Sequence, residues 1–182
     1  MGKQMTDLAF ITDGGAAVAG LVLGLISMGV EHCPGDGCLA RRDVAPGASV
    51  AAGAVVFQES TTGAEVYLRR DTRVAYGPFR LAYGASLSED GEAWAGAGFA
   101  YRFQPQAWNW YAEFHLMPGL YAEGSGADLG GPVQFRSGLE LGYETRRGLR
   151  IGLGFDHRSN GGLRSRNPGL ETVHLRLSFP TN

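Results

Sequence analysis

The chain has 182 residues, of which 29 are glycine and 10% are aromatic, and its formal net charge is −2 at pH 7. This length suits one domain, and the near-balance of charge argues against the basic excess that nucleic-acid-binding domains normally carry. Two cysteines are too few for a disulfide-built scaffold. High glycine and aromatic content with only 19% charged residues favours an all-β protein.

The N-terminal segment, residues 1–45, differs in character from the rest of the chain. It contains an uncharged apolar run over residues 14–30, slightly shorter than a usual membrane-spanning helix. The run is longer than most secretion-signal cores, and Asp7 and Asp13 precede it where a signal would carry positive charge. Three interpretations stay open: an atypical signal-like segment, an extra strand or anchor of the mature protein, or a spanning helix.

The two cysteines flank a Pro-Gly turn in the sequence Cys-Pro-Gly-Asp-Gly-Cys. Such a turn allows Cys33 and Cys38 to form a disulfide, which would indicate an oxidising compartment such as the bacterial envelope. The alternatives are two free thiols, or a metal site that includes His32. The sequence has no second cluster of ligands that would support the metal site.

The main domain, residues 46–182, consists of segments of about ten residues in which apolar and polar side chains alternate. Side chains of a strand alternate between two faces, so each segment has one apolar and one polar face. The predicted strands are 50–58, 64–74, 79–87, 92–103, 108–117, 133–144, 149–158 and 171–179.

Two architectures are compatible with this alternation. A soluble sandwich or lipocalin-type barrel would bury the apolar face, whereas a membrane barrel would turn it outward around a polar lumen. The length of the strands and the aromatic residues near their ends favour the membrane barrel. Its lumen would hold a set of charged residues: Arg80, Arg102, Glu113, Arg136, Glu140, Glu144 and Arg150.

The predicted connections differ in length between the two ends of the strands. Connections 118–132 and 159–170 are the longest and fall at the same end, while 75–78, 104–107 and 145–147 at the other end are all short. Outer-membrane barrels have long external loops and short periplasmic turns. The sequence therefore predicts an eight-stranded antiparallel up-and-down transmembrane β-barrel with both chain ends on the periplasmic side.

Three polar residues share the apolar faces of the last two predicted strands. His157 and Ser159 continue the parity of Leu153 and Phe155, and Glu171 has the parity of the apolar positions that follow it. The two strands are antiparallel neighbours, so the three side chains meet at the external end. A hydroxyl, an imidazole and a carboxylate form the set of an activated serine nucleophile.

The connection between these strands offers groups that could support such a site. Asn160, Gly161, Gly162 and Asn167 supply amide donors for an oxyanion nearby. The alternative interpretation is that all these residues are loop-end polar groups with no joint role. Asp156, His115 and His174 fall on polar faces and are expected to form ion pairs or hydrogen bonds in the lumen.

The stretch from His157 to Glu171 resembles the active-site segment of the lipid A 3-O-deacylases. The family pattern is His-x-Ser-Asn, a small residue, Gly-Leu, a short loop with Asn, and Gly-x-Glu. The matching residues here are His157, Ser159, Asn160, Gly161, Gly162, Leu163, Asn167, Gly169 and Glu171.

The resemblance implies a bacterial outer-membrane serine esterase that removes an ester-linked acyl chain of lipid A without a cofactor or metal. It implies His157, Ser159 and Glu171 as the catalytic triad. By the same match, Asn160, Gly162 and Asn167 are the candidates for shaping the oxyanion site and the loop. Because lipid A is phosphorylated, Arg164 and Arg166 in the external loop are candidate substrate contacts. The rival hypotheses are a non-enzymatic small barrel, structural or lipid-binding, and a soluble lipocalin-like binder. Nucleic acid is not an expected partner, and the oligomeric state is left open.

Overall fold

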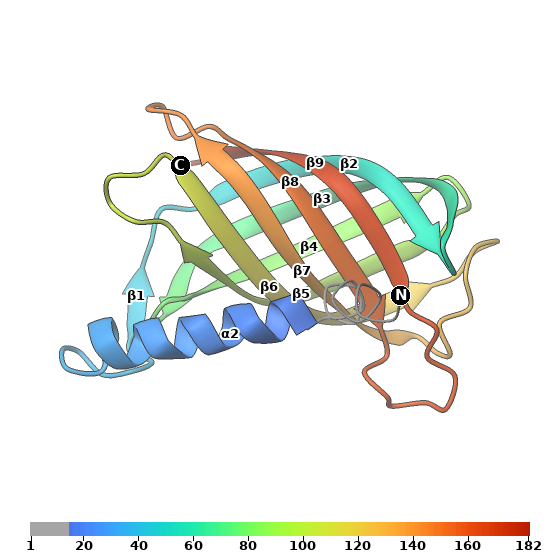
Figure 1. Ribbon diagram of the computed structural model, residues 1–182, viewed down its shortest axis with the longest axis horizontal. Coiled ribbons are helices and arrows are strands. Elements are labelled where there is room, and N and C mark those ends of the chain that lie inside the picture. Colours follow the sequence, from blue (N-terminus) through green and yellow to red (C-terminus); the bar gives the residue numbers. More distant parts are fainter. Residues whose placement is uncertain (1–14) are drawn as a thin grey trace, which may run out of the picture.

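The computed structural model describes residues 15–182, so residues 1–14 of the predicted N-terminal segment lie outside the described part (Figure 1). The elements of the described part are two helical segments, α2 (Gly15–Ser27) and the π-helix η1 (Met28–His32), followed by strands. The strands are β1 (Arg41–Asp43), β2 (Gly47–Phe57), β3 (Ser60–Tyr76), β4 (Phe79–Ser88), β5 (Ala93–Phe103), β6 (Trp110–Ala122), β7 (Val133–Glu144), β8 (Arg150–Ser159) and β9 (Leu170–Pro180).

Strands β2 to β9 form a closed barrel, visible in Figure 1. Each strand pairs antiparallel with the next one along the chain, and β9 pairs with β2 to close the ring. The predicted eight-stranded antiparallel barrel is therefore confirmed. Closure leaves these eight strands without a free edge, which an antiparallel sheet in a membrane requires.

Strand β3 is longer than the predicted segment 64–74, and its alternation is interrupted. It has 17 residues, and a bulge between Asp71 and Ala75 interrupts its pairing with β4. A bulge adds an unpaired residue and so breaks the period of two. Beyond the bulge, the end of β3 pairs with β1, which lies within the predicted N-terminal segment.

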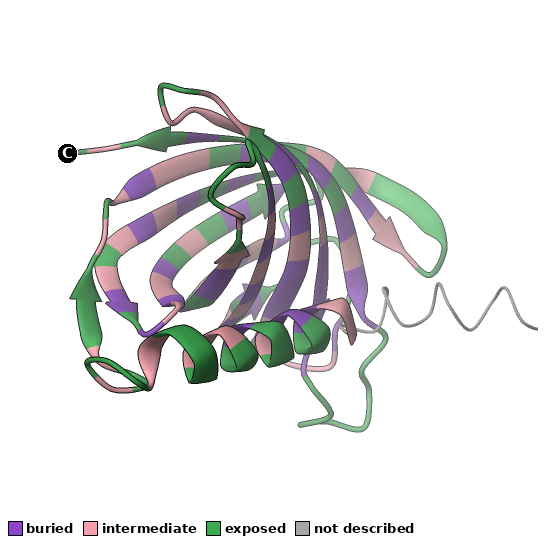
Figure 2. Cartoon of the chain, turned by 60° about the vertical axis from the view of Figure 1, so that its left-hand side comes forward, coloured by how far each residue is buried: buried purple, intermediate pink, exposed green. Residues whose placement is uncertain are grey.

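The apolar face of the strands points outward and the polar face points into the barrel. Figure 2 shows buried and exposed positions alternating along the strands. Large apolar side chains such as Leu141, Leu153 and Leu175 are each 59–64% exposed on the outer wall. This orientation is the reverse of a soluble lipocalin-like barrel, so that hypothesis is wrong.

Ion pairs fill the lumen. The Arg136 guanidinium, which is fully buried, donates to Asp156 at 2.6 Å, Glu65 at 2.8 Å and Ser86 at 3.1 Å. Arg158 binds the other oxygen of Glu65 and donates to the Thr172 hydroxyl at 3.1 Å. Further pairs lie nearer the barrel end opposite the β8–β9 loop. They join Arg69 to Asp71 and Glu113, Arg102 to Glu113, and Arg176 to Glu140.

Helix α2 packs against the outer wall of the barrel over β5, β6 and β7 (Figures 1 and 2). Its contact face is made of small residues: a Cβ at Gly20 would collide with the Phe114 ring, and one at Gly24 would lie 2.6 Å from Phe79. Since the segment is helical, it does not form an extra strand, and the signal-like, anchor and spanning-helix interpretations stay open. Residues Gly15–His32 are long and apolar enough to cross a membrane, a test that a signal sequence near the N-terminus also passes.

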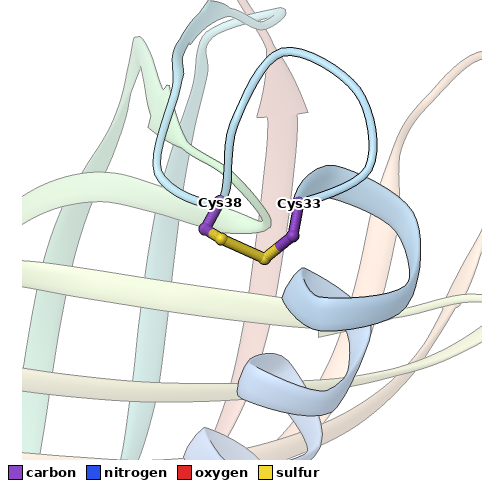
Figure 3. Close-up of a disulfide and its surroundings, with 2 residues drawn as sticks. All are labelled: Cys33 and Cys38. Atoms are coloured by element: carbon purple, nitrogen blue, oxygen red, sulfur yellow. A yellow bond between two sulfur atoms is a disulfide. The ribbon is translucent and has the colours of Figure 1, made fainter.

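A short loop follows the helical segment, and a disulfide between Cys33 and Cys38 closes it (Figure 3). The His32 ring lies 3.3 Å from the Arg42 guanidinium of β1. Within residues 15–182, no three His, Cys, Asp or Glu side chains are placed to hold a metal ion. The loop connects α2 to β1, and β1 pairs with β3 of the barrel.

Replacing Arg136 tests the role of the lumen ion pairs. Arg136→Met leaves the buried carboxylates of Glu65 and Asp156 without their main partner, and breaking such a pair typically costs about 3–5 kcal/mol. We expect the temperature at which the folded band is lost in heat-modifiability gels to fall clearly. Arg146→Ala, in an exposed turn, serves as the control and should leave it unchanged. Equal unfolding temperatures for both variants would contradict a stabilising role.

Candidate active site

The end of β8 presents His157 and Ser159 on the outer wall. Their neighbours Asp156 and Arg158 are 1% and 0% exposed and bind lumen partners, so strand alternation turns positions 157 and 159 outward. In the sheet register His157 lies opposite Glu171 of β9. The structure therefore brings the three predicted residues to one face at one end of the barrel.

His157 and Glu171 are in direct contact. The imidazole Nδ1 lies 3.1 Å from the Glu171 Oε1 atom, which is hydrogen-bond distance. A neutral imidazole that donates from Nδ1 to the carboxylate keeps its lone pair on Nε2. This arrangement orients the ring and leaves Nε2 able to accept a proton.

Ser159 lies on the same wall as His157, about 7 Å further along the strand at the usual rise. It is half-buried and lies opposite Phe135 of β7 in the register. Within residues 15–182, no hydrogen bond joins the Ser159 hydroxyl to His157. Catalytic hydrogen bonds are often long in enzymes without substrate and tighten when the substrate binds.

Gly169 packs directly against the imidazole. Its backbone φ is +77°, and a Cβ at this position would lie 2.8 Å from His157 Cε1 and 3.4 Å from Glu171 Oε1. Both the left-handed backbone and the available space require glycine. The sequence motif contained Gly169, but its role in supporting the ring is visible only in the folded chain.

Asn160 organises the loop that follows Ser159. Its side-chain amide donates to the carbonyl oxygens of Leu129 at 3.0 Å and Arg166 at 2.6 Å. Its side-chain oxygen accepts from the Gly162 N–H at 3.0 Å, and its own N–H donates to the Asn167 side-chain oxygen at 2.9 Å. The side chain is 99% buried, so these contacts give Asn160 and Gly162 a loop-shaping geometry.

The two loop arginines have different surroundings. Arg166 forms an ion pair with Asp128 at 3.2 Å and donates to the Asp128 carbonyl, which ties it to the β6–β7 loop. Arg164 lines a pocket of about 240 Å³ with Leu163 and Val133 between the two external loops. Only Arg164 therefore faces a space that could receive a substrate group.

The other titratable residues considered from the sequence lie in the lumen. The His115 Nε2 atom is 3.4 Å from Asp156 Oδ1, and the His174 Nδ1 atom is 3.8 Å from Asp156 Oδ2. All three side chains are at least 97% buried. The barrel wall separates them from His157, so they belong to the lumen ion-pair network.

Removing the Asn160 side chain tests its loop-shaping role. Asn160→Ala loses three side-chain hydrogen bonds, so the 160–169 loop should lose its fixed conformation and fit a protease active site more readily at its exposed arginines. We expect trypsin to cleave at Arg164 or Arg166 severalfold faster in outer-membrane preparations. Asn109→Ala, which removes one hydrogen bond at the other barrel end, is the control. Unchanged cleavage in Asn160→Ala would contradict this role.

Comparisons with solved structures support the same architecture. The crystal structure of the outer membrane enzyme PagL is 21% identical, with a TM-score of 0.59, covering 74% of this chain and 99% of its own. Neisserial surface protein A is 11% identical, with a TM-score of 0.56, covering 78% of this chain and 99% of its own. A de novo designed transmembrane β-barrel is 12% identical, with a TM-score of 0.52, covering 77% of this chain and 98% of its own. At these identities the likeness shows the fold.

A comparison with curated protein sequences found no match. A family model described as lipid A 3-O-deacylase (PagL) does match, over residues 52–180. This range covers most of the chain, includes nearly all of the barrel from β2 to β9, and contains His157, Ser159 and Glu171. The chain is an outer-membrane β-barrel and belongs to the lipid A 3-O-deacylase (PagL) family.

Proposed function

We propose that the protein is a serine esterase that hydrolyses an ester-linked acyl chain of lipid A at the 3-O position. The observation that carries this proposal is the contact between His157 and Glu171 on the outer wall, with Ser159 on the same face. Family membership supports lipid A as the substrate class. The outer wall is where the acyl chains of a membrane lipid lie, so the substrate need not enter the lumen.

The reaction follows the general scheme of serine acyl transfer. His157 Nε2 accepts the Ser159 proton while the Ser159 oxygen attacks the ester carbonyl carbon. The protonated imidazole, stabilised by the Glu171 carboxylate, then gives the proton to the departing sugar oxygen, which leaves as a hydroxyl. Water attacks the acyl-enzyme by the same route and releases a free fatty acid. None of these steps requires a cofactor or a metal.

An oxyanion forms in each tetrahedral intermediate and needs hydrogen-bond donors. The Asn160 side chain already uses both its amide hydrogens within the loop. Within residues 15–182, the Gly161 N–H and the Asn167 side-chain amide donate to no protein acceptor. These two groups are the donors we assign to the oxyanion, with Asn160 and Gly162 holding the loop in place.

Substitution of the triad tests the proposed reaction. Ser159→Ala, His157→Ala and Glu171→Gln should each lower lipid A deacylation, by about a thousandfold or more for the first two. The measurement is mass spectrometry of lipid A from cells that express each variant. The wild type should release one hydroxyacyl chain, and Ser159→Ala should not.

A serine on the neighbouring strand supplies the matched control. Ser137 lies opposite His157 in the register and on the same outer wall, yet its hydroxyl faces the His157 carbonyl at 3.5 Å. Ser137→Ala should therefore retain deacylation. Loss of deacylation in Ser137→Ala but not in Ser159→Ala would contradict the assignment of Ser159 as the nucleophile. An inserted wild-type barrel that leaves lipid A unchanged would favour the non-enzymatic alternative.

Arg164 is the residue we assign to a phosphate of the lipid A head group. It lines the pocket between the external loops, whereas Arg166 is held by Asp128. Arg164→Ala should raise KM for bisphosphorylated lipid A about fivefold to tenfold, with little change in kcat. The same variant should show wild-type KM for lipid A lacking phosphates. An equal effect on both substrates would contradict phosphate recognition.

A further inference from the structure

Helix α2 lies beside the proposed active site on the outer wall. Its first turn contributes Ala16 and Ala17 to a narrow gap that is also lined by Ser137, Leu139 and His157. The gap has a volume of about 10 Å³, close to the minimum that one water molecule requires. An acyl chain cannot pass between the helix and His157 on this side.

The surroundings of His157 show which approach remains. The side chain is only 9% exposed although it lies on the outer wall. Gly169 and Glu171 adjoin the imidazole from the β9 side, and Ala16 and Ala17 lie on the β7 side. Within residues 15–182, the Nε2 atom has no hydrogen-bond partner. The substrate must therefore reach the His157 Nε2 atom without passing between His157 and α2.

The opposite side of the site offers an open apolar surface. On β9, Val173 and Leu175 are 43% and 64% exposed on the outer wall. They lie opposite Ala54 and Ala52 of β2, both exposed and both small. Larger apolar side chains beside alanines form a shallow strip that runs from Glu171 towards the membrane interior.

We propose that α2 is a retained part of the enzyme that walls the acyl-chain site on its β7 side and directs the chain along β9 and β2. The inference rests on the proposed esterase function. It assigns the helix a role in selectivity: a linear acyl chain fits along the strip, whereas a branch next to the ester carbonyl meets the first turn of α2.

Two features attach α2 to the barrel. Gly20 and Gly24 let the helix backbone approach the rings of Phe114 and Phe79 closely. At its C-terminal end, the disulfide-closed loop leads into β1, which pairs with β3. The helix lies outside the segment that the family model matches, so it is an addition to the part this chain shares with its family.

Thiol cross-linking in isolated outer membranes tests the position of the helix. Ala17→Cys combined with Ser137→Cys should form an intramolecular disulfide on mild oxidation with iodine, a small oxidant, because both positions line the same narrow gap. Val18→Cys with Ser137→Cys is the matched control, because Val18 is 61% exposed and does not line the gap. Equal cross-linking of both pairs, or an intact mass showing that the mature protein lacks α2, would overturn the proposal.

Selectivity between two esters tests the proposed role of α2. The probes are p-nitrophenyl octanoate and its branched isomer p-nitrophenyl 2-ethylhexanoate, used with the full chain in detergent. In Gly20→Leu the new side chain collides with Phe114 and lifts the helix. We expect the preference in kcat/KM for the linear ester to fall about tenfold, with the rate on the linear ester changing less than about twofold.

Two controls separate this inference from the proposed function. Val18→Leu, on the exposed side of α2, should keep the wild-type preference. If Ser159→Ala abolishes hydrolysis of both esters but Gly20→Leu keeps the wild-type preference for the linear ester, the esterase proposal stands and the role of α2 in selectivity is refuted. If the wild type hydrolyses neither ester and leaves lipid A unchanged, the proposed function is refuted, and the role of α2 in selectivity is refuted with it.

Discussion

Ion pairs in the lumen fix strand β8, and the candidate active site depends on that strand. Asp156 binds Arg136, and Arg158 binds Glu65, all within the barrel. Because side chains alternate, holding these two positions inward holds His157 outward. A slip of one residue would turn the imidazole into the lumen and the charged side chains into lipid, where ionised groups are strongly unfavourable. The lumen thereby sets the register of a site on the opposite face of the wall.

The same constraint explains how polar groups persist on a membrane-facing surface. An isolated imidazole or carboxylate there would lose its hydration without compensation. His157 and Glu171 avoid this by bonding to each other across the β8–β9 pair. The pairing that makes the site compatible with the membrane also orients the imidazole. The compatibility of these polar groups with the membrane and the orientation of the imidazole, our proposed general base, therefore have one origin, the antiparallel register of the last two strands.

The sequence was sufficient for the barrel and for the face that carries the site, because both follow from a period of two. It was insufficient where a local interruption or a distant contact decides the outcome. The bulge in β3 hid the continuation of that strand to Tyr76. The bonds of Asn160 to Leu129 and Arg166 join two loops, so loop shaping could not be separated from oxyanion binding. The packing of α2 depends on Phe114, 94 positions after Gly20, and no local pattern reports it.

Glycine connects the composition of the chain to the architecture of the site. Its abundance first indicated an all-β protein, but several glycines serve close approach rather than strand geometry. Gly169 lets the loop backbone pass beside the imidazole, and Gly20 lets α2 lie against the barrel wall. A side chain at either position would push apart the elements that flank His157. The site is narrow because two backbones approach it from opposite sides, and glycine is the residue that permits both approaches.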